Sequence, residues 1–222
     1  MALLNESVRQ QLREILGQVR PVDLELYGAG DDEATTTMRT LLAELAETVP
    51  GLTVNEPVDV PALEPGHDTG MPMEGPVLVV RGLGRGAVRF VGMTVGLEFS
   101  TLVEAIRQAG GGPTTLSPAT VRALEALDGP VHIQVFTTPT CPYCPQAVHL
   151  AHEMAFASDK VVADMVDAST FPSLSDKYGV MGVPAQYFNG ALSQVGAAPE
   201  HVVLDLVRKA ARLGAGQVQA GA

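Results

Sequence analysis

The stretch VHIQVFTTPTCPYC, residues 131–144, decides the fold of this 222-residue chain. It runs from an apolar segment typical of a β-strand into two cysteines spaced two residues apart, and the chain has no others. A helical pattern rich in alanine, histidine and methionine follows. A cysteine pair at this spacing, where a strand gives way to a helix, indicates a redox-active dithiol.

The two cysteines are expected to differ in reactivity. Cys141 is predicted to lie in the first turn of the helix, where backbone N–H groups and the helix dipole lower the pKa of a thiol. Cys144 follows one turn later, close enough to form a disulfide with it. No acidic residue lies within several positions, so nothing nearby in the sequence opposes a thiolate. The alternative is a pair of inert thiols.

A zinc site is a second alternative for this pair, because His149 and His152 follow it. A structural zinc ion usually needs four ligands. His149 lies roughly 140° around a helix from Cys144, which is poor convergence on one ion. We therefore expect no metal ion and no cofactor, and we expect both histidines to lie on a solvated face or to add modest positive charge.

The composition narrows the class of protein. The net charge is −11 and the isoelectric point is about 4.8, which argues against a nucleic-acid partner and against anionic membrane surfaces. Hydrophobic residues make up 46% of the chain, yet no apolar run approaches the ~20 residues of a membrane span. The N-terminus has no signal-peptide pattern. These features predict a soluble cytoplasmic protein with no structural disulfide framework.

The chain is predicted to contain two copies of one α/β unit. Each copy reads helix, strand, helix, strand, proline-led strand, strand, helix, and residues 22–27 of the first copy alternate like residues 131–136 of the second. The glycine-rich stretch 110–113 is the best candidate for a linker. The predicted units are therefore residues 1–112 and residues 113–222.

The first unit carries no redox pair. In the alignment of the two copies, Cys141 corresponds to Asp32 and Cys144 to Thr35. Asp32 is predicted to be one of several acidic residues that complement the dipole at the start of a helix.

The elements follow from periodicity, caps and breakers. Residues 56–75 are predicted to form a loop, Gly82-x-Gly84-x-Gly86 a turn between two strands rather than a phosphate loop, and Asn189-Gly190 a hairpin turn. The predicted helices are 5–20, 31–48, 98–109, 117–127, from the cysteines to 157, 171–178 and 200–213, and the predicted strands are 22–27, 52–55, 76–81, 87–91, 131–136, 160–166, 184–188 and 191–195.

Val183-Pro184 forms a second motif, roughly 40 residues after the cysteines. Thioredoxin-like folds place a cis-proline at this point, and X–Pro bonds become cis at modest energetic cost. The bend would bring the Val183 backbone against the disulfide, where it could pair with an extended substrate chain. An ordinary trans proline is the alternative. Asp167, at the end of a central strand, could accept a proton, although a turn or cap residue is the expected role.

The chain resembles the protein disulfide oxidoreductase (glutaredoxin-like) family, in which two thioredoxin-fold units are fused in tandem. The resemblance rests on residues 136–145, 177–184 and 189–190, with 88–92 and 96–99 in the first half. It implies an α/β fold of two tandem thioredoxin-like units, each a central mixed sheet flanked by helices.

The resemblance also implies roles for individual residues. Cys141 would be the attacking thiol, Cys144 the resolving thiol and Pro184 the cis-proline. Many members carry a C-x-x-C in each unit, and its absence from the first unit here argues against isomerase activity that needs two coupled sites. The residues expected to bind substrate are Pro142, Tyr143, Val183 and Pro184.

The arrangement is also similar to the N-terminal domain of the flavoprotein subunit of alkyl hydroperoxide reductase, which passes electrons to a peroxiredoxin. The C-P-Y-C is similar to that of glutaredoxins, but residues 196–200 replace their glutathione-binding element, so glutathione is not the expected reductant. The resemblance implies protein disulfide substrates, a thioredoxin-reductase-like flavoprotein and, as a further candidate, a peroxiredoxin. A dedicated electron donor and a non-enzymatic, redox-switched binding module remain alternatives to a general thiol–disulfide oxidoreductase.

Overall fold

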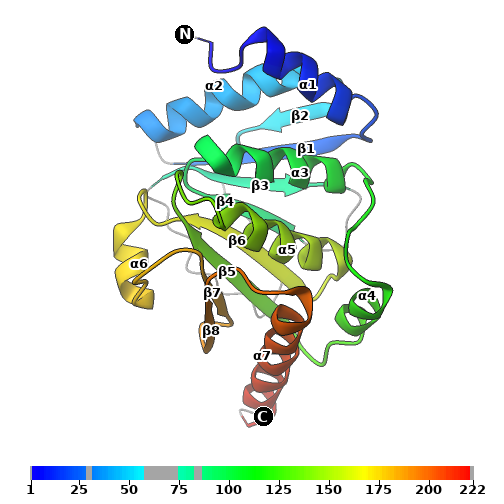
Figure 1. Cartoon of the computed structure of the whole chain (residues 1–222), viewed down its shortest axis with the longest axis vertical. Helices are drawn as coiled ribbons and strands as arrows, with labels where there is room; N and C mark the ends of the chain where they lie inside the picture. Colours follow the sequence, from blue (N-terminus) through cyan, green and yellow to red (C-terminus); the bar gives the residue numbers. More distant parts are fainter. Residues whose placement is uncertain (1, 29–31, 58–74, 83–86, 221–222) are drawn as a thin grey trace.

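The structure is a computed structural model that describes residues 2–28, 32–57, 75–82 and 87–220. Most of the predicted loop 56–75, together with Gly84 and Gly86 of the predicted turn, lies outside the described residues. Figure 1 shows all eight strands in one sheet, with the order β2-β1-β3-β4-β6-β5-β7-β8. The elements are α1 (Glu6–Leu16), β1 (Val22–Tyr27), α2 (Glu33–Thr48), β2 (Leu52–Asn55), β3 (Val77–Arg81), β4 (Ala87–Val91), the 3₁₀ helix η1 (Gly96–Glu98), α3 (Phe99–Ala109), α4 (Pro118–Glu125), β5 (Val131–Thr137), α5 (Cys144–Ala157), β6 (Val161–Asp167), α6 (Pro172–Tyr178), β7 (Ala185–Phe188), β8 (Leu192–Val195) and α7 (Glu200–Ala220).

Each half of the chain contributes a mixed set of four strands. In the first half β1 is parallel to β2 and antiparallel to β3. In the second half β5 is parallel to β6 and antiparallel to β7. The prediction of an α/β fold with two repeated units, each a mixed sheet flanked by helices, is confirmed.

The two halves are joined strand to strand, which the sequence did not predict. Strand β4 of the first half pairs in parallel with β6 of the second, from Ala87 opposite Val162 to Val91 opposite Val166. Parallel strands with both faces covered read as continuous apolar runs, and β6 is buried along its whole length. The pairing therefore merges the two sheets into one.

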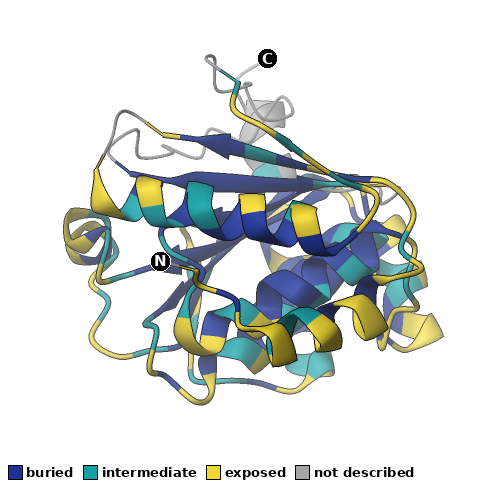
Figure 2. Ribbon diagram, turned by 90° about the horizontal axis from the view of Figure 1, so that it is seen from above, coloured by how far each residue is buried: buried dark blue, intermediate teal, exposed yellow. Residues whose placement is uncertain are grey.

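Helices cover the two faces of this sheet unequally. The large core lies between one face and helices α1 to α5 and α7, whereas α6 packs on the opposite face against a smaller cluster that includes Phe136 and Val166. Figure 2 shows the helices buried on their inner sides and exposed on their outer sides. In the described part of the chain, no helix combines the length and apolar character needed to cross a membrane.

A buried ion pair crosses the junction between the halves. Arg89 on β4 lies opposite Asp164 on β6, and its Nε and Nη2 donate to the two carboxylate oxygens at 2.6 and 2.5 Å. His132 on β5 contacts the same carboxylate at 2.7 Å. Burial alone would raise the pKa of Asp164, but Arg89 and His132 hold it well below its usual range. The carboxylate is therefore ionised and shared by three strands.

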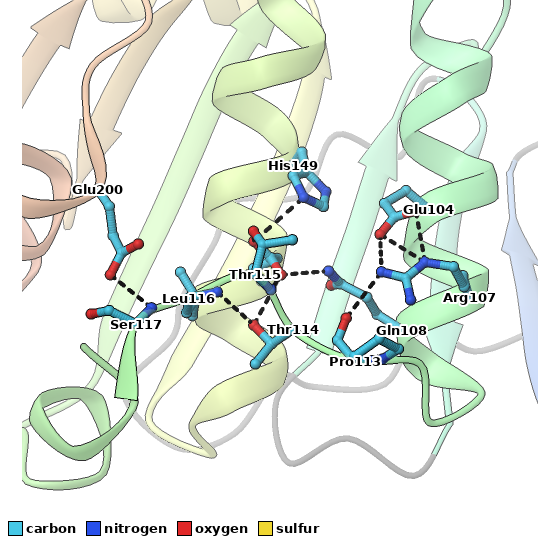
Figure 3. A network of polar contacts seen from close by, with 11 residues as sticks. Glu104, Arg107, Gln108, Pro113, Thr114, Thr115, Leu116, Ser117, His149 and Glu200 are labelled. Carbon is cyan, nitrogen blue, oxygen red and sulfur yellow. Dashed lines mark hydrogen bonds and ion pairs between the residues drawn. The ribbon is translucent and has the colours of Figure 1, made fainter. Parts of the chain in front are cut away.

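The stretch between the halves is held by a second buried carboxylate (Figure 3). Glu153 on α5 is buried, and it accepts hydrogen bonds from the backbone N–H of Thr115 and the hydroxyl of Thr114. It also accepts one at 2.9 Å from Gln108 on α3, in the first half. The glycine-rich stretch predicted as a linker is thus followed directly by residues fixed to both halves.

Two helix ends differ from the prediction. Helix α1 ends at Leu16 rather than near Arg20, because the chain turns after Gly17 and the Arg20 N–H donates to Gly110 O at 3.1 Å. That tertiary contact replaces the last helical turn. At the other end, α7 continues past Leu213 to Ala220, since the alanine- and glutamine-rich tail contains no proline to end it.

The hairpin prediction is confirmed. Strands β7 and β8 pair antiparallel around Asn189-Gly190, and both turn residues have positive φ, 51° and 64°. A two-residue turn with positive φ at both positions is the type that Asn-Gly favours.

We expect Asp164→Asn to lower the free energy of unfolding by about 3–5 kcal/mol, because the change removes the carboxylate from a buried, charged arginine. Urea denaturation at neutral pH measures the loss. Glu6→Gln is the matched control, since the Arg13–Glu6 pair at 2.9 Å is largely exposed and exposed pairs contribute about 0–1 kcal/mol. A loss below about 1 kcal/mol for Asp164→Asn, the range of an exposed pair, would show that the pair does not stabilise the junction.

Candidate active site

The two cysteines form a disulfide at the carboxyl end of β5, with their Cα atoms 5.5 Å apart. Cys144 is the first residue of α5, so Cys141 lies three residues ahead of the helix and not in its first turn, as predicted. The reason is a tight turn that ends β5, in which the Cys141 N–H donates to Thr138 O at 3.1 Å. Cys141 is the more accessible of the two cysteines, with 7% of its surface exposed against 0% for Cys144.

The cis-proline motif lies at the same end of the sheet. The Val183–Pro184 peptide bond is cis. Ala185, the next residue, pairs with Phe136 on β5, and the Gly196 N–H donates to Pro184 O at 2.8 Å. This loop is therefore fixed beside the strand that leads into the disulfide.

The predicted substrate-binding residues fall into two groups. Pro142 and Tyr143 are exposed, and Tyr143 has 68% of its surface accessible. Val183 is partly buried and Pro184 is buried. A partner can therefore reach the side chains of the C-P-Y-C turn directly, whereas it would meet the cis-proline loop mainly through backbone. Their role in binding remains a prediction.

A buried carboxyl group from the first half lies beside this site, and the sequence reasoning missed it. Glu98 in η1 is 1% exposed. Its helix packs against α5, and the neighbouring Leu97 N–H donates to Pro139 O at 3.1 Å. Because the acid comes from residues far from the cysteines in the chain, a search of neighbouring positions could not find it. The resemblance included residues 96–99, and this was the only signal in the sequence.

Glu98 is poised to exchange a proton. Burial raises its pKa to about 7, against the lowering effect of the Thr101 hydroxyl, and the nearby Asp167 carboxylate raises it further. One carboxyl oxygen, Oε1, has no hydrogen-bond partner among the described residues. A carboxyl group with a pKa near neutrality can take up a proton from a thiol at physiological pH.

Asp167 has the local role that was the expected one. Its carboxylate accepts hydrogen bonds from Ser169 N at 2.9 Å and from the Thr170 hydroxyl at 2.5 Å. These contacts close the turn after β6. Its effect on the site therefore passes through the charge it places near Glu98.

The two histidines after the cysteines occupy different environments. His149 is partly exposed and forms an ion pair with Glu153 at 3.4 Å. His152 is buried, which contradicts the prediction of a solvated face, because its ring packs edge-on against Phe90 of β4 with centroids 4.9 Å apart. Burial lowers the pKa of His152 to about 3. In the described part of the chain, no cluster of His, Cys, Asp and Glu is arranged to hold a metal ion.

The position equivalent to the disulfide in the first half is a helix cap. Asp32 precedes α2, and its carboxylate accepts from the Thr35 N–H at 2.9 Å and from the Thr35 hydroxyl at 2.5 Å. The hydrogen bonds from Thr35 lower the pKa of Asp32. The acid predicted to complement the helix dipole is thus the N-cap, and a polar pair stands where the second half has its sulfurs.

Known proteins share these features. A family model described as a thioredoxin domain matches residues 131–206. A protein disulfide oxidoreductase from Aeropyrum pernix superposes with a TM-score of 0.77 and 33% identity over 94% of both chains. The NTD_N/C domain of alkylhydroperoxide reductase AhpF from Enterococcus faecalis superposes with a TM-score of 0.78 and 25% identity, over 92% of this chain and 99% of that one.

Among curated relatives, the AhpF protein of the alkyl hydroperoxide reductase of Staphylococcus epidermidis is 27% identical over 194 residues, which is 85% of this chain. The matched region is 34% of that protein. The chain therefore spans about a third of the length of this relative, which leaves most of AhpF without a counterpart here.

We expect Glu98→Gln to remove one ionisation near pH 7 from the pH profile of thiol–disulfide exchange. Glu98 is neutral below its pKa of about 7 and anionic above it, and only the anion accepts a proton, so wild-type activity should rise through this range. A general base typically contributes about 10² or more, so the variant should be slower by roughly that factor at pH 8.

Stopped-flow rates between pH 5 and 9 provide the measurement. Glu104→Gln is the control, because Glu104 lies on the adjacent α3 in a partly exposed ion pair with Arg107. An unchanged inflection in Glu98→Gln would show that Glu98 does not accept the proton.

Proposed function

The chain belongs to the protein disulfide oxidoreductase family, and from this we propose that its Cys141–Cys144 dithiol reduces, or in reverse forms, disulfides in protein substrates. The single observation that supports the proposal best is the disulfide itself. One cysteine is accessible at its surface, and the other is buried as the first residue of a helix. This asymmetry suits an attacking thiol and a resolving thiol.

The reaction proceeds in two exchanges. The Cys141 thiolate attacks one sulfur of a substrate disulfide, which forms a mixed disulfide and releases the other substrate sulfur as a thiolate that takes up a proton. Cys144 then loses its proton, with Glu98 as the acceptor, and attacks the Cys141 sulfur. The mixed disulfide breaks, and the substrate leaves with both thiols reduced. Two electrons have passed to it, and the 141–144 disulfide remains.

Substrate recognition uses the loops around the disulfide. The backbone of Val183 pairs with an extended segment of the substrate, in the manner of an added strand. Tyr143 and Pro142 contact the same segment from the side of the cysteines. Pro184 shapes the loop from within, because it is itself buried.

A flavoprotein of the thioredoxin-reductase type returns the disulfide to the dithiol. Support comes from the AhpF relatives of alkyl hydroperoxide reductase, whose greater length has no counterpart in this chain. The chain itself needs no cofactor for thiol–disulfide exchange, since the electrons reside on sulfur. A reducing, cytoplasmic location is part of the same proposal.

We expect Cys141→Ser to abolish disulfide reduction and Cys144→Ser to accumulate mixed disulfides with substrate proteins, because only the first exchange remains possible. Non-reducing gels and mass spectrometry detect the trapped species. Reduction of these species by a dithiol should release the substrate intact. Full activity in Cys141→Ser would overturn the mechanism.

The second candidate is a dedicated electron donor to one peroxiredoxin, and the similarity to AhpF favours it. Insulin separates the two functions: a general reductase reduces it at a rate comparable to thioredoxin, whereas a dedicated donor does not. The assay needs the full chain, because deleting residues 1–112 would remove β4 and expose the edge of β6. Loss of activity in that deletion would therefore report on folding as well as on catalysis.

The reduction potential tests both enzymatic functions against the binding-module alternative. We expect the Cys141–Cys144 pair to equilibrate with dithiol buffers near the ~−270 mV of thioredoxin. A potential near the ~−120 to −180 mV of oxidants and isomerases would favour disulfide formation instead. Absence of a measurable couple would leave only a binding module.

A further inference from the structure

Exposed hydrophobic side chains gather around the disulfide. Among the described residues, seven large hydrophobic side chains are exposed, and three of them, Leu3, Ile15 and Leu213, lie in α1, in the segment before it, or in α7. The other four belong to segments that border the active site. We call these four the apolar rim: Leu97, 45% exposed, Tyr143, 68%, Met181, 98%, and Val195, 69%.

Three members of the apolar rim come from the second half. Tyr143 lies between the two cysteines, and Met181 precedes the cis Val183–Pro184 bond by two residues. Val195 pairs with Ala185, directly after Pro184. Each is therefore tied by chain or by strand pairing to the loops that surround the disulfide.

The fourth member comes from the first half and is brought to the site by a close backbone approach. The Leu97 N–H donates to Pro139 O at 3.1 Å, two residues before Cys141. A Cβ on Gly96 would lie 2.7 Å from the same oxygen, and Gly96 has φ +64°. A glycine is needed for this approach, so the local backbone is built to hold Leu97 beside the cysteine turn.

The surroundings of the disulfide are also uncharged. Residues 92–97, 138–145, 179–185 and 194–199 contain no Asp, Glu, Lys or Arg, although such residues make up 18% of the chain. Grouped exposed apolar side chains mark interaction sites more often than single ones do. Because only 7% of the surface of Cys141 is exposed, a partner sulfur can reach it only if the partner presses against this surface.

We propose that the half without cysteines forms part of the docking surface for substrate proteins, with Leu97 completing the apolar rim. The occupant is an extended protein segment that carries the exchanging cysteine and has apolar side chains next to it. The inference rests on the proposed function and deepens it, because it defines the class of sequence recognised. A small disulfide bonds to Cys141 without reaching Leu97.

Two peptides linked through their single cysteine to thionitrobenzoate test the proposal. One has leucine on both sides of the cysteine and the other has glutamine. Attack by Cys141 forms a peptide mixed disulfide and releases coloured thionitrobenzoate, so the rate is read directly. We expect the reduced full-length protein to react about tenfold faster with the leucine peptide, as burial of an apolar side chain allows.

Leu97→Gln keeps the size of the side chain and adds no charge next to Glu98. We expect it to reduce the leucine-to-glutamine rate ratio at least threefold, while the rate with bis(2-hydroxyethyl) disulfide stays within twofold of wild type. Ile15→Gln, at an exposed position on α1 of the same half, should leave the ratio unchanged.

An unchanged ratio in Leu97→Gln would overturn the docking role, and so would an equal loss with all three substrates, which would indicate a damaged disulfide. Loss of the ratio in Ile15→Gln as well would also overturn it, because the effect would not be specific to the rim. Failure of the wild-type protein to release thionitrobenzoate from any peptide would instead contradict the proposed function.

Discussion

The parallel pairing of β4 with β6 is the constraint on which the site depends. In a parallel pair the carboxyl ends of both strands meet at one edge of the sheet, and β5 is parallel to β6 as well. The segment after β4 and the cysteine turn after β5 therefore emerge side by side. Without this pairing η1 would have no reason to lie against α5 or against Pro139.

The register of that pairing is fixed by charge as well as by apolar surface. A shift of one residue would turn Arg89 to the other face of the sheet, where the large core lies. A shift of two would separate it from Asp164. Since a buried guanidinium without a carboxylate is strongly unfavourable, the ion pair specifies how the two halves meet.

The halves have divided their tasks. The second half keeps the disulfide, whereas the first has Asp32 and Thr35 at the equivalent position, where a carboxylate caps the helix. The first half nevertheless places a carboxyl group, Glu98, beside the redox site of the second, and its loop reaches the cysteine turn through Leu97. A repeat that has no cysteines of its own thus still shapes the environment of the remaining pair.

Local signals in the sequence were read correctly where the cause was local. The Asn189-Gly190 hairpin, the cysteine pair between a strand and a helix, and the order of elements in each repeat depend on residues close together in the chain. The errors occurred where distant residues decide. Helix α1 stops early because Arg20 bonds to Gly110, and His152 is buried because β4 of the other half lies against α5.

The sequence by itself determined the redox chemistry, because two cysteines two residues apart after an apolar strand define a dithiol site through local geometry alone. Only the tertiary structure decided which acid lies beside that site. Glu98 is more than forty positions before Cys141, and it reaches the site through the pairing of β4 with β6. Its pKa near neutrality follows mainly from burial, and burial is a property of the packed molecule that no short stretch of sequence carries.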